Sequence, residues 1–229
     1  MQERWKRFLF VGTVGAALIV AVLAWSGSGS AQGMPVLLQI TTPTEGTVVH
    51  PGQTVTIVVA PISGDSFISV LVKGPYPFSV SPPVSASPYQ LSLSVPQKIA
   101  AGKYAITAYG ARSSQNAGMS KPIHLDVEPG TPIASMRVDN PTIIFKQAGD
   151  KIPVRVWGTF SDGSTMEITK SSGITYSSGN PNIATVDAIG WVTAVGHGTM
   201  SATPIVVKYG DQTAVLQIST TYLPPDAKP

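Results

Sequence analysis

The stretch Val154–Thr203 reads VRVWGTFSDGSTMEITKSSGITYSSGNPNIATVDAIGWVTAVGHGTMSAT, and it decides the fold class. Between Ile152 and Phe160, apolar residues and one glycine occupy every second position, which is the period of a strand with one buried face. The pair Asp162-Gly163 interrupts this run, and Asp-Gly between alternating segments predicts a β-hairpin. Three more clusters predict further turns: Asn180–Asn182, Gly190 and Gly196–Gly198. Turns this frequent leave no room for a helix of ordinary length.

Several turns and strands of this region follow one another as they do in a known family. The pieces are GTFSDGS, the Ile168-Thr169 step, ITYSSGNPNIATVDAIGWVTAVGHGT and the closing run AVLQI at 214–218. Over residues 133–221, the chain resembles the bacterial Ig-like group 2 domain, a module of intimins and invasins. The resemblance implies a β-sandwich and no catalytic residue. The family's members serve as spacers, adhesin arms or accessory domains, so it does not fix a function. Trp191 departs from the pattern, because the family usually has a smaller or polar residue there.

The first half of the chain also reads as a sandwich of short strands. Clear alternation predicts strands at Thr54–Val59, Gln90–Val95 and Ile123–Val127. Three more strands are predicted at 36–41, 67–73 and 103–109, and a seventh is open near 78–80. This spacing is typical of a β-sandwich, and residues 36–128 resemble Ig-like domains in general. Tyr104, just after a turn, is interpreted either as a corner tyrosine that bonds upstream backbone or as a plain half-buried strand residue.

Five prolines lie between Gly74 and Pro88. Proline has no N–H to give to a sheet, so we interpret this segment as a stiff connector that blunts a sheet edge, with a binding loop as the alternative. The full division of the chain is then a leader and tether at 1–33, a sandwich at 34–128, a linker at 129–132, a second sandwich at 133–222 and a disordered tail at 223–229.

The N-terminal residues 1–33 are predicted to be a targeting segment. Arg4, Lys6 and Arg7 precede Phe8–Trp25, an uncharged and mostly apolar run that is expected to be helical. Its length lies between that of a signal peptide and that of a membrane span, so a cleaved leader and an uncleaved anchor both remain open. Either interpretation places the remaining chain outside the cytoplasm, because the positive end stays inside. Membrane contact is expected through this segment alone.

Composition argues against several kinds of chemistry. The net charge is +3, but the leader supplies most of it, so no basic patch for nucleic acid is expected. The 229 residues include no cysteine, which removes thiol nucleophiles and disulfides. His50, His124 and His197 are read as surface residues without metal-ligand spacing. No cofactor and no metal site is predicted, and no catalytic motif is visible.

Two exposed aromatic residues are the candidate binding site. Trp157 falls on the strand face opposite Val154 and Val156, and Trp191 follows a turn glycine. Such rings stack on sugars or fill a partner's pocket, although packing on a neighbouring loop or domain is an alternative. The predicted function is that of a non-catalytic Ig-like spacer or adhesion module at the cell envelope, with a protein or glycan partner. An accessory subunit of an envelope enzyme or transporter is the second hypothesis, and a hydrolase with a site invisible in the sequence is the third.

Overall fold

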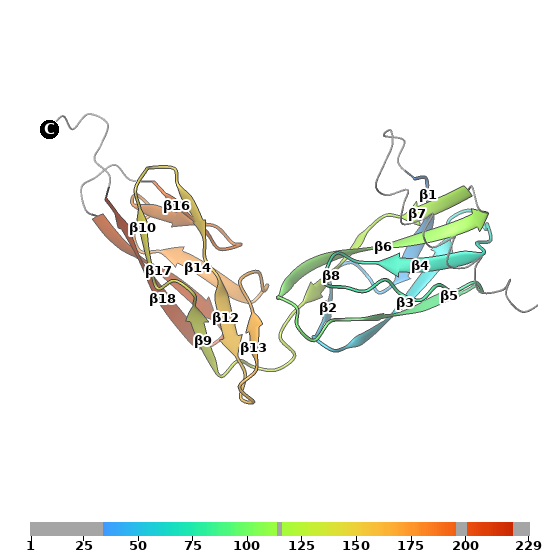
Figure 1. Ribbon diagram of the computed structural model, residues 1–229, viewed down its shortest axis with the longest axis horizontal. Helices are drawn as coiled ribbons and strands as arrows, with labels where there is room; N and C mark the ends of the chain where they lie inside the picture. Colours follow the sequence, from blue (N-terminus) through green and yellow to red (C-terminus); the bar gives the residue numbers. More distant parts are fainter. Residues whose placement is uncertain (1–33, 114–115, 196–200, 222–229) are drawn as a thin grey trace, which may run out of the picture. The chain divides into compact units, whose positions relative to one another are not determined.

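The computed structural model describes residues 34–113, 116–195 and 201–221 (Figure 1). These residues form eighteen strands and no helix, so the expected all-β class is confirmed. Several sheets are present, which is consistent with β-sandwiches. None of the described residues belongs to a helix that is long and apolar enough to cross a membrane. The leader, the turn around His197 and the tail at 223–229 lie outside the described residues.

The chain divides into two compact units. Of the described residues, one unit takes in those up to Thr47, Thr54–Ser94 and Tyr104–Leu125, and the other takes in Val48–Gln53, Val95–Lys103 and those from Asp126 on. The boundaries at 128 and 133 stay a prediction.

The first large sheet contains eight strands. They are β1 (Val36–Thr42), β2 (Thr47–Val49), β3 (Thr54–Pro61), β4 (Ser69–Lys73), β5 (Tyr89–Ser94), β6 (Gly102–Ser113), β7 (Asn116–Ser120) and β8 (Ile123–Val127). Their order is β2-β8-β6-β7-β1-β3-β5, and β4 pairs with β6 beside this path. β1 pairs with β3 antiparallel and with β7 parallel, so it joins one half of the sheet to the other. Two of these strands, β2 and β7, were not predicted, whereas the strand left open near 78–80 is absent.

Alternation of side chains explains these strands. In β5, Tyr89, Leu91 and Leu93 are buried while Gln90, Ser92 and Ser94 are exposed. β3 repeats the pattern with Val55, Ile57 and Val59 inward. Residues that are paired across β3 and β5 therefore point to the same face of the sheet. The buried side chains of the two strands form one continuous apolar layer.

One buried tyrosine ties a loop to this core. Tyr89 is 2% exposed, and its hydroxyl donates to the Phe67 carbonyl at 3.0 Å and accepts from the Phe67 N–H at 2.7 Å. The rings of Phe67 and Tyr89 also meet edge to face at 6.3 Å. Tyr104 is half-buried, and its ring packs edge to face on Phe78 at 5.5 Å. The Tyr89 hydroxyl thus bonds to upstream backbone, a role that sequence reasoning did not predict for this residue, and the corner role of Tyr104 stays a prediction.

The proline-rich segment covers the free side of β4. Val70 and Val84 exchange two backbone hydrogen bonds of 2.8 and 2.9 Å. Ser81 donates its N–H to the Val72 carbonyl at 2.9 Å, and its buried hydroxyl accepts the Val72 N–H at 2.8 Å. These bonds pair the outer groups of β4, as the connector interpretation expected.

The remaining ten strands build three further sheets (Figure 1). The largest has the order β10-β18-β17-β14 and contains β10 (Thr142–Phe145), β14 (Ile174–Ser178), β17 (Ser201–Tyr209) and β18 (Gln212–Thr220). The second contains β11 (Lys151–Pro153), β15 (Ala184–Val186) and β16 (Trp191–Ala194), with β16 in the middle. The third contains β9 (Ser135–Val138), β12 (Val156–Thr159) and β13 (Thr165–Glu167), with β12 in the middle.

The strand predicted from Ile152 to Phe160 is split between two sheets. Val154 donates its N–H to the Gly190 carbonyl at 2.8 Å and so ends the β11–β16 ladder. Two residues later, Val156 donates to Thr169 Oγ1 at 3.0 Å and accepts from Ile168. The alternation of buried residues continues through the switch, because Val154, Val156 and Gly158 are all buried. The predicted alternation of buried residues is therefore correct, but a change of hydrogen-bond partners divides the segment into two strands.

Candidate functional site

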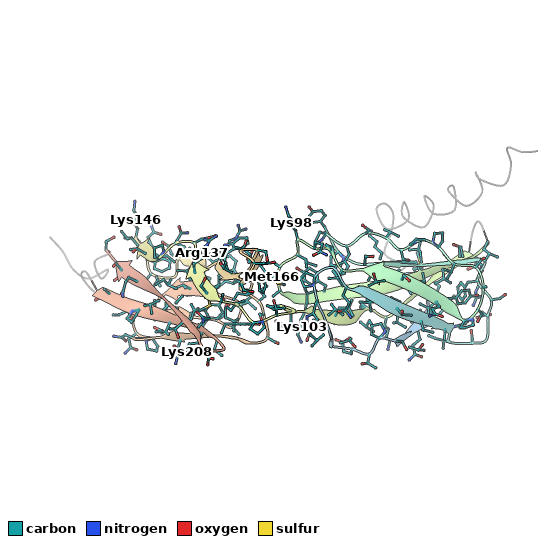
Figure 2. The ribbon with its side chains drawn as sticks, turned by 90° about the horizontal axis from the view of Figure 1, so that it is seen from below. Lys98, Lys103, Arg137, Lys146, Met166 and Lys208 are labelled. Atoms are coloured by element: carbon teal, nitrogen blue, oxygen red, sulfur yellow. The ribbon has the colours of Figure 1, made fainter. Side chains whose placement is uncertain are left out.

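Trp157 lies on the outer face of the three-stranded sheet. In β12 it stands between buried Val156 and buried Gly158, and it is itself half-buried. Its register partners are Arg137 on β9 and Glu167 on β13. The Arg137 guanidinium, labelled in Figure 2, lies 5.5 Å from the centre of the indole ring, in reach of a cation–π interaction. The sequence placed Trp157 on this face correctly, but its neighbours cover part of the ring.

Arg137 and Asp139 form an ion pair beside this ring. Their Nη1 and Oδ1 atoms are 2.8 Å apart. The buried Trp157 Nε1–H has no hydrogen bond of good geometry among the described residues. This indole is nevertheless the largest influence that lowers the pKa of Asp139 below its ordinary value, ahead of Arg137 and Arg155. Trp157 is thus held by charged neighbours, which favours a structural role for much of its ring.

Trp191 is the more exposed of the two tryptophans. Its residue is 39% exposed, and Ile189 on the preceding turn is 48% exposed. Pro153, also exposed, is its register partner on β11. We call the three residues Pro153, Ile189 and Trp191 the Trp191 patch. It presents apolar side chains on the surface of a sheet without an ionisable group among them.

The turn beneath the Trp191 patch is rigidly built. The Asp187 carboxylate accepts the N–H of Ile189 at 3.0 Å and that of Trp191 at 2.8 Å. Backbone bonds also join the Asp187 N–H to the Trp191 carbonyl and the Gly190 N–H to the Asp187 carbonyl. Beneath the turn lies Tyr176, whose hydroxyl donates to the Thr169 carbonyl at 2.9 Å and whose pKa is raised by burial. Sequence reasoning predicted the turn at Gly190 but identified neither Asp187 nor Tyr176 as a residue that fixes it.

Trp157 and Trp191 belong to different sheets. Trp191 pairs with Pro153, and four residues of chain, about 13 Å if extended, lead from Pro153 to Trp157. Ring contacts join Phe67 to Tyr89 and Phe78 to Tyr104, and none joins the two tryptophans in the described part of the chain. A single patch containing both rings stays a prediction, and the contacts favour Trp191 as the binding residue.

The described histidines have separate partners. His124 Nδ1 lies 2.8 Å from Glu45 Oε1, and His50 Nδ1 lies 3.0 Å from the Glu128 carbonyl. Within residues 34–113, 116–195 and 201–221, no three His, Asp or Glu residues are grouped so as to hold a metal. Asp162, in the predicted hairpin, accepts the Ser164 N–H at 2.9 Å and hydroxyl at 2.6 Å. Both bonds lower its pKa and serve the turn.

No family model matches the chain, and no curated protein does. The Ig-like group 2 assignment therefore stands as a resemblance only. Solved structures give distant likenesses. Fibronectin(III)-like modules of Clostridium thermocellum CbhA are 17% identical, with 42% of this chain and 100% of theirs covered and a TM-score of 0.35. Extracellular domains 3–5 of Drosophila OTK are 12% identical, with 83% and 68% covered and a TM-score of 0.37.

Domains 1–6 of the surface layer protein SbsC are 13% identical, with 86% of this chain and 29% of theirs covered and a TM-score of 0.34. Glycosidases also occur at this level, among them a β-glucuronidase of Bacteroides uniformis with a TM-score of 0.33. Likenesses this distant establish neither a shared family nor a shared activity.

Proposed function

We propose that the protein is a non-catalytic pair of Ig-like β-sandwiches that works outside the cytoplasm as a spacer and binding module at the cell envelope. The observation that carries the binding role is the Trp191 patch. A tryptophan residue that is 39% exposed stands there on a turn whose backbone is fixed by the Asp187 carboxylate. Little conformational freedom would be lost when a partner packs on such a ring, which is the property of a binding anchor.

The location outside the cytoplasm is supported by the N-terminal sequence. Basic residues Arg4, Lys6 and Arg7 precede an apolar run, which is the order found in signal peptides and anchors alike. The absence of cysteine fits a module whose folding depends on core burial alone. The partner class is a protein or a glycan, because indole rings serve both.

The test measures binding of residues 34–229 to isolated cell-envelope material by co-sedimentation. Truncation of an anchoring tryptophan commonly costs more than about 1 kcal/mol, so Trp191→Ala should weaken binding about fivefold or more. Tyr76→Ala is the matched control, because Tyr76 is 94% exposed and lies on the first unit. Equal binding by wild type and Trp191→Ala would end the proposal, as would equal losses in both variants.

A second measurement separates the partner classes. The emission of Trp191 should shift to shorter wavelength when peptidoglycan fragments are titrated, if the partner is a glycan. A protein partner would leave that titration flat and would instead be recovered from solubilised envelope at a fixed stoichiometry. Recovery of one envelope enzyme or transporter in this way would favour the accessory-subunit hypothesis.

A further inference from the structure

The outer edge of β5 is an open strand edge. β5 pairs with β3 alone and ends the strand order of its sheet. Val95, just after β5, exchanges backbone hydrogen bonds with Gly52 and Gln53, on the β3 side. The backbone N–H and C=O groups of successive residues point to opposite sides of a strand, so those of Leu93, Leu91 and Tyr89 also face β3. The N–H and C=O groups of the three intervening residues point away from the sheet: Gln90, Ser92 and Ser94.

These three residues have no backbone partner among the described residues. Their side chains are exposed as well. The other edges of the same sheet differ. The free side of β4 is covered by Ser81 and Val84, and β2 is only three residues long. β5 is therefore the edge in this sheet that keeps both length and unpaired backbone.

The edge also lacks the features that normally prevent strand pairing. Tyr89–Ser94 contains no charged residue and no proline, and charged side chains and prolines are the usual protections of an edge. The neighbouring outer face is uncharged too. Its exposed side chains are hydroxyls and amides: Gln39, Thr41, Thr54, Thr56, Gln90, Ser92 and Ser94. Nothing on this surface would repel an identical surface.

We propose that β5 pairs antiparallel with β5 of a second copy of this chain, around a twofold axis at Ser92. In that register Ser92 faces Ser92 of the other copy, and Gln90 faces Ser94 in both directions. All three outward residues of each copy then meet outward residues of the other, which gives about six backbone hydrogen bonds. The result is one sheet that continues through both copies.

The occupant and the register follow from the same residues. An isologous contact needs a surface that is complementary to itself. The spacing Gln90, Ser92, Ser94 is symmetric about its centre, and a neutral edge adds no like-charge repulsion between copies. Pro88 and Pro96 flank the strand and cannot donate to a ladder, so they limit pairing to the residues between them. This interface does not depend on the binding role proposed for the Trp191 patch.

The test uses the full chain, solubilised in detergent, with a single introduced thiol, because the protein has no cysteine of its own. In Ser92→Cys, the two Cα atoms would lie about 5.5 Å apart across the axis, which suits a disulfide. The control is Thr56→Cys, since Thr56 is the register partner of Ser92 one strand inward and is also exposed. Its two thiols would lie about 15 Å apart and should not join.

Mild oxidation should give at least about tenfold more covalent dimer from Ser92→Cys than from Thr56→Cys. The unmodified chain should sediment at twice its monomer mass after correction for detergent. Ser92→Lys should return it to the monomer mass with an unchanged circular dichroism spectrum, because two ammonium groups would face each other. Equal crosslinking of the two cysteine variants would overturn the proposal. A monomeric wild type, or a dimer that persists in Ser92→Lys, would do so too.

Discussion

Gly190 should be far less replaceable than Gly163, although both have a left-handed backbone. Their φ angles are 84° and 81°, so alanine at either position costs about 1–2 kcal/mol in strain. Alanine also lowers the conformational entropy of the unfolded chain, which offsets up to about 1 kcal/mol of this cost at either position. For Gly163, a Cβ atom would have no neighbour within 4 Å, so nothing further is lost. Gly163→Ala should therefore lower the free energy of unfolding by only about 1 kcal/mol.

At Gly190, the same Cβ atom would meet the protein itself. It would lie 2.9 Å from Thr169 Cγ2 and 3.2 Å from the Val154 carbonyl oxygen. Thr169 cannot rotate away freely, because its hydroxyl accepts the Val156 N–H and donates to Glu167 Oε1. Such overpacking adds about 1–3 kcal/mol, so Gly190→Ala should cost about 2–4 kcal/mol in total.

Urea unfolding of residues 34–229 measures both variants with the same probe. This chain retains only Trp157 and Trp191, and Trp191 adjoins Gly190, so tryptophan emission reports on the right unit. The dependence of the unfolding free energy on urea concentration should stay constant, while the urea concentration at the unfolding midpoint should fall. Equal losses in Gly163→Ala and Gly190→Ala would show that the contacts with Thr169 and Val154 do not constrain the turn.

Three further predictions concern single contacts. Tyr89→Phe removes the only side-chain partner shown for the buried Phe67 N–H and C=O. It should lower the free energy of unfolding by about 1–3 kcal/mol, measured by urea unfolding followed by circular dichroism. Tyr76→Phe, at an exposed site, should change the same quantity by less than about 0.5 kcal/mol. The pKa of Asp139 lies below its ordinary value in the folded protein. Its stabilising contribution is therefore present above about pH 4 and is lost as the pH falls through the folded pKa. As the pH is lowered from 6 to 2, the melting temperature should fall less steeply in Asp139→Asn than in wild type. Asp187→Ala leaves the Ile189 and Trp191 N–H groups without their carboxylate, which should raise acrylamide quenching of Trp191 while Asp162→Ala, at a separate turn, leaves it unchanged.

The local features of the chain could be predicted from its sequence. Alternation along Thr54–Val59 and Gln90–Val95 predicted strands that the structure contains almost unchanged as β3 and β5. Gly190 was expected to form a turn, and β15 and β16 do pair across it. These predictions succeeded because the period of buried residues and the φ angle of a turn depend on residues close together in the chain.

Tertiary structure alone decided which distant groups meet. Tyr89 bonds to Phe67, which is 22 residues away in the sequence, and Arg137 lies over the ring of Trp157, which is 20 residues away. The strand that begins at Ile152 changes sheets where the Thr169 hydroxyl accepts a backbone hydrogen bond. β5 keeps an open edge while the free edge of β4 is covered, because a loop lies beside β4 alone. A strand's pattern records which face is buried, whereas its pairing partners are set by long-range packing that no short stretch of sequence contains.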